Sequence, residues 1–117
     1  MNKEIRIKNK IEFNDIITNG KKNSNLYFAI YNKERKLDFP RFGIALSRNF
    51  GNAVHRNRYK RILREIIRNN QKKFENKYDY IIIMKKTCMG LEYKVIENNL
   101  LTLIKQEEKW KRKLWSY

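Results

Sequence analysis

Apolar side chains recur along this chain with a helical period in three places. Residues 11–19 carry them three or four positions apart, and Gly20 follows as a stop signal, which predicts a short first helix. Residues 52–69 show the same period, and residues 93–114 predict a long amphipathic final helix. The apolar positions of the first and last helices are Phe13, Ile16, Ile17, Val95, Ile96, Leu100, Leu103 and Ile104.

Three shorter segments favour strands. Residues 26–32 and 41–47 are rich in apolar and aromatic residues and are separated by a polar stretch that contains Pro40, so we expect two antiparallel strands. Residues 79–84 form a continuous apolar run that is typical of a buried strand. The order α-β-β-(β)-α-β-α, with room for a further short strand near the N-terminus, predicts an α/β fold. We expect an α+β sandwich in which three helices pack on a small mixed sheet of about four strands, within a single domain over residues 1–117.

The charge of the chain points to a polyanionic partner. Lys and Arg number 28 against 12 Asp and Glu, which gives a formal net charge of +16 over 117 residues. Because 41% of residues are hydrophobic and 13% aromatic, a disordered basic tail is excluded. Nucleic acid is the expected partner, and an anionic membrane surface is the second choice.

Other classes are disfavoured by what the sequence lacks. No run of 18 apolar residues and no signal-peptide segment is present, so we expect neither membrane insertion nor secretion. A single cysteine, Cys88, excludes an internal disulfide, and a single histidine, His55, leaves no Cys/His zinc cluster. These features favour a cytoplasmic protein.

Arginine is concentrated in the predicted central helix. Six of the ten arginines lie within residues 48–68, where Glu65 is the only acidic residue. At roughly 100° per residue, apolar side chains form one stripe and cations form another face. The stripe comprises Tyr59, Ile62, Leu63, Ile66 and Ile67, and the cationic face comprises Asn57, Lys60, Arg61, Arg64 and Arg68, with Arg56 and Arg58 at its borders. Because Glu65 alone cannot neutralise these cations, this face predicts contact with nucleic acid. The alternative is an ordinary solvated helix surface.

The segment before this helix is a second candidate phosphate site. Residues 47–52 include Arg48, the flexible Gly51 and a good N-cap, Asn52, so backbone N–H groups and the positive helix end would face a phosphate. The alternative is a plain helix start.

No constellation of a protein active site is visible, since the chain has one histidine, no nucleophile elbow and no Gly-rich phosphate loop. A purely structural RNA-binding protein, such as a small ribosomal component, therefore stays open. A sequence-specific DNA-binding protein is less favoured, because no second helix stands two to four residues before Asn52 to build a helix-turn-helix, and we expect no DNA partner.

The stretch SRNFGNAVHRNRYKRILRE, residues 47–65, resembles the signature of the protein subunit of bacterial ribonuclease P. The order and length of the predicted elements agree with that family over residues 5–115. The resemblance implies a left-handed strand-helix-strand crossover around the signature helix. It also implies a ribonucleoprotein endonuclease, a hydrolase of tRNA processing, in which the RNA subunit cleaves the 5′ leader from precursor tRNA. The required Mg²⁺ is then bound mainly by RNA, and the protein needs no active site of its own.

The resemblance also implies roles for individual residues. Contact with the catalytic RNA carries over to Arg56, Asn57, Arg58, Lys60, Arg61 and Arg64. A cleft between the sheet and the first helix, which would hold the leader, carries over to Phe13, Tyr31, Phe28 and Ser47. Two positions depart from the family pattern: Arg48-Asn49 replaces a pair of basic residues, and Ile17 replaces a second aromatic. We expect leader contacts there to be weaker or rearranged.

Overall fold

A computed structural model describes the backbone of residues 5–115 and the side-chain surroundings of residues 5–106. The elements in chain order are α1 (Lys10–Asn19), β1 (Lys21–Ser24), β2 (Phe28–Glu34), β3 (Arg41–Leu46), α2 (Ala53–Asn69), β4 (Tyr78–Met84) and α3 (Tyr93–Trp115). Short 3₁₀ turns at Gln71–Lys73 and Lys86–Cys88 flank β4. The three predicted helices and the strand at residues 79–84 are confirmed.

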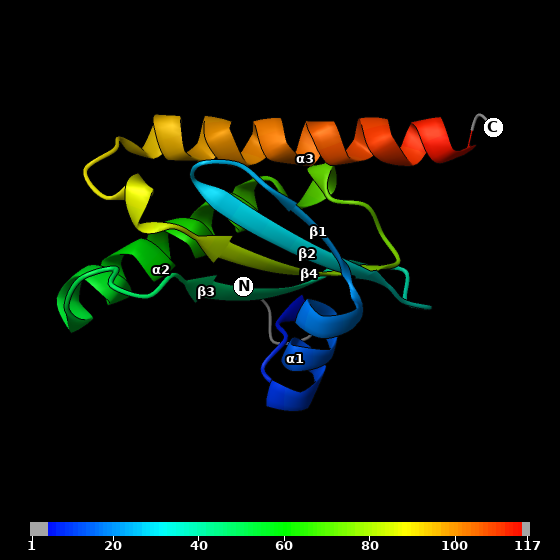
Figure 1. Ribbon diagram of the computed structural model, residues 1–117, viewed down its shortest axis with the longest axis horizontal. Helices are drawn as coiled ribbons and strands as arrows, with labels where there is room; N and C mark the ends of the chain where they lie inside the picture. The colour runs from blue at the N-terminus through cyan, green and yellow to red at the C-terminus, as the bar shows by residue number, and fades with distance from the viewer. Residues whose placement is uncertain (1–4, 116–117) are drawn as a thin grey trace.

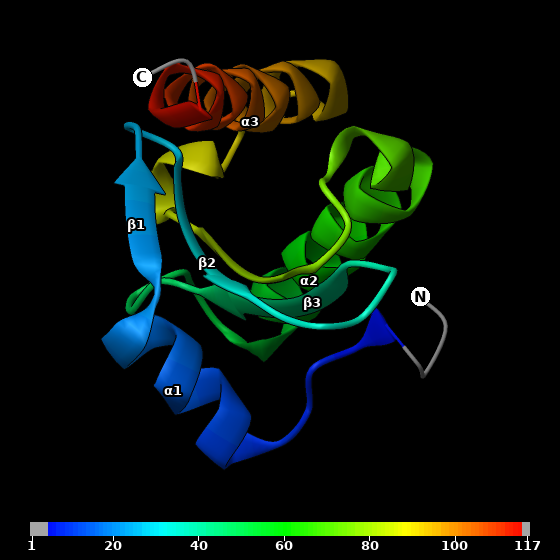
Figure 2. The ribbon, with the colours of Figure 1, turned by 90° about the vertical axis from the view of Figure 1, so that its right-hand side faces the viewer.

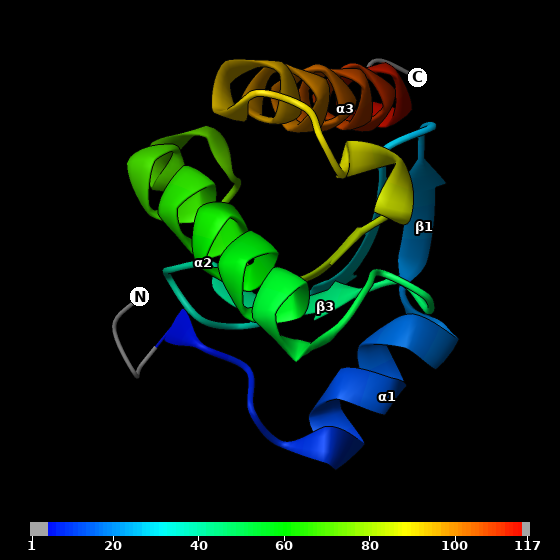
Figure 3. The same ribbon diagram turned by 90° about the vertical axis from the view of Figure 1, so that its left-hand side faces the viewer.

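The four strands form one mixed sheet in the order β1-β2-β4-β3. The last strand in sequence, β4, lies inside the sheet, antiparallel to β2 and parallel to β3. The helices form layers on its two sides: α1 lies below the sheet and α3 above it in Figure 2, while Figure 3 shows α2 beside β3, between the levels of the other two helices. The predicted α+β sandwich is confirmed, and α3 extends beyond the end of the sheet in Figure 1.

The larger core lies between the sheet and the two later helices. Alternate residues of β2, β3 and β4 point to this side, where they meet the apolar stripes of α2 and α3. The buried helix residues are Tyr59, Leu63, Ile66 and Ile67 of α2 and Ile96, Leu100, Leu103 and Ile104 of α3. Cys88 is also fully buried here, and its burial raises the pKa of the thiol to about 11. In the part of the chain that is described, no helix is long and apolar enough to cross a bilayer.

The opposite side of the sheet, here called the α1 face, carries a smaller cluster. Ile7, Ile16 and Ile81 are buried, and four further side chains pack on them while keeping part of their surface exposed: Phe13, Ile17, Tyr31 and Ile83. The absence of a side chain at Gly43 makes room for this packing. A Cβ there would stand 2.9 Å from Phe13 Cε2 and 2.6 Å from Ile81 Cδ1, so glycine lets the Phe13 ring lie close to β3.

An ion-pair network attaches α1 to the sheet. The Asp79 carboxylate on β4, only 6% exposed, accepts from Arg41 Nε and Nη2 at 3.0 and 2.9 Å and from Arg35 Nη1 at 3.1 and 3.2 Å. Burial raises the pKa of Asp79, and the Arg41 guanidinium acts in the opposite direction. Arg41 Nη2 also donates to Glu12 Oε2 on α1 at 2.8 Å, so one guanidinium connects β3, β4 and α1.

The structure refines the expected arrangement of the strands. The strands at residues 26–32 and 41–47 run antiparallel, but they are not neighbours, because β4 is inserted between them. The first of them begins at Phe28, since Asn25 Oδ1 accepts from the N–H groups of Tyr27 and Phe28 and forms a turn there. The extra strand is β1, residues Lys21–Ser24, whose polar sequence gave no strand signal, and near the N-terminus Arg6 makes only an isolated bridge to Phe42.

Replacing Asp79 by Asn should destabilise the fold by about 2 to 4 kcal/mol, because two guanidinium groups then lose their shared charge partner in a buried position. Urea unfolding measures the loss. The exposed Asp38 offers a control with the same change of charge, and Asp38→Asn should stay within about 0.5 kcal/mol of the parent. Equal small effects of both substitutions would show that the network contributes nothing.

Candidate nucleic-acid interface

The turn into α2 is fixed by local backbone geometry. Asn49 and Gly51 have φ values of 63° and 98°, in the left-handed region, and Asn52 then caps the helix by accepting from His55 N at 3.1 Å. The turn brings the end of β3 next to the first turn of α2. There Arg56 Nη1 donates to the Ser47 carbonyl at 3.4 Å, and the Ser47 hydroxyl accepts from Lys86 N at 3.0 Å.

The outward face of α2 carries the cations that the sequence assigned to it. Arg58, Arg61 and Arg68 are exposed, as is Asn57, while Arg56, Lys60 and Arg64 are half-buried. Among the described residues, the ion pairs that the structure contains involve none of these cations. Arg48 and Asn52, in the preceding loop, are also exposed. These nine residues, Arg48, Asn52, Arg56, Asn57, Arg58, Lys60, Arg61, Arg64 and Arg68, are called the α2 cationic surface below.

Arg64 of this surface is half-buried and lines a hollow on the helix. Arg61, Arg64, Glu65 and Arg68 line a shallow hollow on α2. Arg64 Nε is buried and has no hydrogen-bond partner in the described part of the protein. Three arginines and one glutamate line the hollow, so its net positive charge suits an anionic group.

The α1 face holds two of the four residues expected to contact a single strand. Phe13 of α1 and Tyr31 of β2 pack in the same cluster, and both residues are half-buried. Ser47 lies farther along the same side of β3, past Gly43 and Ala45, beside the start of α2. The structure therefore brings Phe13 and Tyr31 together and places Ser47 between them and the α2 cationic surface.

The assignment of Phe28 to this site is wrong. Its side chain is 0% exposed and lies in the larger core, on the side of the sheet that faces α2 and α3. Phe28 and Tyr31 are an odd number of residues apart on one strand, so they point to opposite faces. Of the two, only Tyr31 can meet a ligand on the α1 face.

Sequence reasoning missed Lys22, which stands on the α1 face beside Tyr31. Its Nζ lies 5.6 Å from the centroid of the Tyr31 ring, a cation–π distance. The sequence shows two adjacent lysines, Lys21 and Lys22. Which of them lies beside Tyr31 can be decided only once residues 21–24 are known to be a strand.

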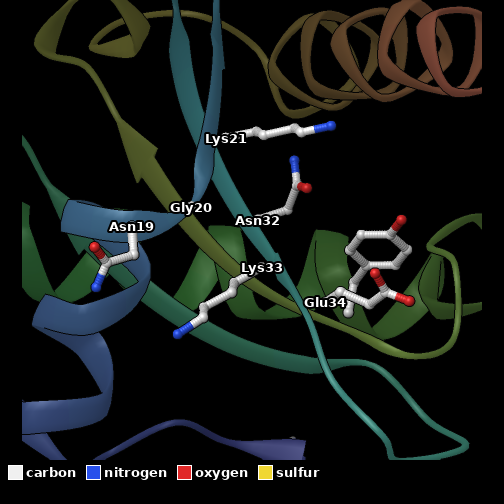
Figure 4. Close-up of a pocket in the computed structure, with 7 residues that line it drawn as sticks. Asn19, Gly20, Lys21, Asn32, Lys33 and Glu34 are labelled. Atoms are coloured by element: carbon white, nitrogen blue, oxygen red, sulfur yellow. The ribbon is translucent and has the colours of Figure 1, made fainter. Parts of the chain in front are cut away.

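The side chains of residues 5–106 determine what this site can offer a ligand. Within that range no three His, Cys, Asp or Glu side chains are grouped so that they could hold a metal ion. The carboxylates of the α1 face are already paired: Glu12 and Asp79 with arginines, and Asp15 with Lys33. A cavity of about 160 Å³ at the ends of α1, β1 and β2, shown in Figure 4, is lined by lysines, amides, Glu34 and Tyr78. What the site offers is positive charge, hydrogen-bond donors and exposed aromatic edges.

Comparisons with known proteins agree with this reading. A family model described as Ribonuclease P matches residues 1–108. The ribonuclease P protein components of Bacillus cereus strain G9842 and of Bacillus anthracis are each 35% identical to this chain over 108 residues. The match covers 91% of this chain and 93% and 90% of those proteins, respectively.

Solved structures show the same similarity. A Staphylococcus aureus RNase P protein, described as a mutant with defective mRNA degradation activity, superimposes with a TM-score of 0.82 at 31% identity, covering 91% of this chain and 90% of its own. The RNase P protein from Thermotoga maritima gives a TM-score of 0.79 at 30% identity, covering 86% of this chain and 96% of its own.

Proposed function

The chain belongs to the ribonuclease P protein family, and from that premise we propose that its two surfaces bind two different RNA segments. The α2 cationic surface binds the RNA subunit, and the α1 face binds the single-stranded 5′ leader of precursor tRNA. The observation that carries the proposal is the α2 cationic surface, whose arginines have no carboxylate partner among the described residues.

The protein component of ribonuclease P is a subunit of an endoribonuclease and assists the RNA subunit in 5′ leader processing of tRNA. An RNA subunit is thus its partner. The contribution of the protein is to lower the electrostatic repulsion between RNA segments and to hold the substrate in place. Arginine suits the first task, because its planar guanidinium binds a phosphate through two parallel hydrogen bonds.

The proposal that the α1 face binds the leader rests on the aromatic and cationic side chains of this face. A single strand exposes its bases, and proteins bind such strands by stacking them on aromatic rings beside a cationic groove. Tyr31 and Phe13 provide rings, and Lys22 provides charge next to Tyr31. Ser47 lies where a strand leaving this face would reach the α2 cationic surface.

The Mg²⁺ requirement belongs, in this proposal, to the RNA. Residues 5–106 contain no suitable group of metal ligands, and the carboxylates of the α1 face already bind lysine and arginine. We therefore assign no residue of this chain to a magnesium ion.

The direct test is reconstitution. The purified protein, freed of nucleic acid, is incubated with the cognate RNA subunit and precursor tRNA at low magnesium, and the 5′ end of the product is mapped. We expect a matured 5′ end only when both subunits are present. RNA-free cleavage of precursor tRNA would refute the proposal, and an mRNA substrate in the same assay shows whether the activity named for the S. aureus protein occurs here too.

Arg58→Ala and Arg61→Ala should each weaken binding of the RNA subunit without unfolding the protein, because both side chains are exposed. Each lost phosphate contact should lower the slope of log affinity against log salt concentration by about 1. Titrations over a range of salt concentrations measure this slope. Lys36→Ala, an exposed cation outside the α2 cationic surface, serves as the control with the same charge change. Slopes that match this control would mean that the helix face is merely solvated.

Tyr31→Leu should weaken binding of precursor tRNA by about 1 to 3 kcal/mol per stacked base, while binding of mature tRNA and of the RNA subunit stays unchanged. Leucine keeps an apolar side chain in the α1 cluster but cannot stack. Tyr27→Leu is the matched control, since Tyr27 packs against the larger core. Phe13→Ala should show the same dependence on the leader together with a lower melting temperature, because Phe13 also packs over Gly43. Equal losses for leader-bearing and leaderless tRNA would remove Tyr31 from the site.

A further inference from the structure

We infer that Lys22 is a leader-binding residue, which covers the exposed side of the Tyr31 ring in the free protein and binds a leader phosphate in the complex. This inference rests on the proposed function of the α1 face and adds a residue to it.

The sheet register places Lys22 next to Tyr31. β1 pairs antiparallel with β2, and Lys22 is the direct cross-strand partner of Tyr31. Directly opposed residues point to the same face of a sheet, so both side chains lie on the α1 face. Lys22 is exposed on the edge strand, and its Nζ is 5.6 Å from the ring centroid.

Four cations on or directly after β2, β3 and β4 are already engaged. Lys33, two residues after Tyr31 on the same side of β2, forms an ion pair with Asp15, and this hydrogen bond lowers the pKa of the Asp15 carboxyl. Arg35 and Arg41 bind the buried Asp79, and Lys85 Nζ donates to the Asn25 carbonyl at 2.7 Å. Lys22 has no carboxylate partner among the described residues, so its charge is available to a phosphate.

A nucleotide base could replace the Lys22 ammonium on the Tyr31 ring. A lysine over an exposed aromatic ring is held only weakly, and its flexible stem lets the ammonium move by several ångströms. A base that stacks on Tyr31 would displace the ammonium from the ring, and the phosphate attached to that nucleotide would then lie within its reach. Ring and cation together bind one nucleotide, through its base and its phosphate.

Lys21 is a matched internal control. It precedes Lys22 on β1 and is also exposed, but its cross-strand partner is Asn32, which lies on the other side of the sheet. Figure 4 shows Lys21 pointing to the side of α3 and Lys33 pointing to the side of α1. Lys21→Ala and Lys22→Ala change the net charge by the same amount. Only Lys22→Ala removes a side chain from the α1 face.

The experiment compares Lys22→Ala with Lys21→Ala in the reconstituted holoenzyme. Affinity is measured for precursor tRNA with a leader of several nucleotides and for mature tRNA, over a range of salt concentrations. Lys22→Ala should lower affinity for the leader-bearing substrate by about two- to fivefold and should reduce its salt slope by about 0.7, the value for one phosphate contact to a single strand. Mature tRNA should bind as before, Lys21→Ala should leave the ratio of the two affinities unchanged, and Lys22→Arg should restore it.

The possible outcomes are distinguishable. Equal effects of Lys21→Ala and Lys22→Ala, or an equal loss for leader-bearing and mature tRNA, would overturn the inference and assign Lys22 to long-range charge only. If Tyr31→Leu shows the leader-dependent loss and Lys22→Ala does not, the inference fails while the proposed leader surface stands. A leader-dependent loss in both Lys22→Ala and Tyr31→Leu supports the inference, whereas a loss in Lys22→Ala alone would overturn the exchange at the Tyr31 ring.

Discussion

The burial of β4 on both of its faces is the constraint on which the rest of the structure depends. Its DYIIIM sequence places Tyr80, Ile82 and Met84 in the larger core and Ile81 in the α1 cluster. A strand that is apolar on both sides must lie inside the sheet and be covered by helices from both directions. The β3-α2-β4 connection supplies one cover, α3 extends it, and α1 provides the other. The α2 cationic surface and the α1 face are thus both consequences of one doubly buried strand.

Charge is divided between the two sides of this strand. Three carboxylates, Glu12, Asp15 and Asp79, bind cations on the α1 face and let α1 pack on the sheet. The α2 cations have no such partners among the described residues, although a net charge of +16 disfavours a compact state. Acidic residues are therefore present where a helix must dock. A polyanion bound on α2 would relieve the repulsion that remains there, and its affinity would then be linked to the stability of the protein.

The sequence predicted what is encoded in local periodicity. The helices, the β4 strand and the apolar stripe of α2 all follow from spacing, and the cationic surface follows from the same helical geometry. What depends on partners distant in sequence was not predictable. The polar strand β1 exists because β2 offers it an edge, and the position of β4 between β2 and β3 is set by burial across the whole sheet. Phe28 was misplaced because its role was taken from the family resemblance, although its spacing from Tyr31 already puts the two side chains on opposite faces of the strand.

The α1 face and the α2 cationic surface are joined through β3 and the turn that follows it. One side of β3 runs from Gly43, under Phe13, to Ser47, whose carbonyl accepts from Arg56 of α2. The turn that follows is fixed by two residues in left-handed conformations and by the Asn52 cap. A leader bound on the α1 face and an RNA bound on α2 would therefore be held at a distance set by β3 rather than by a flexible linker. Such a fixed spacing is what positioning of a substrate requires, because orienting two groups lowers an activation barrier only when their separation is defined.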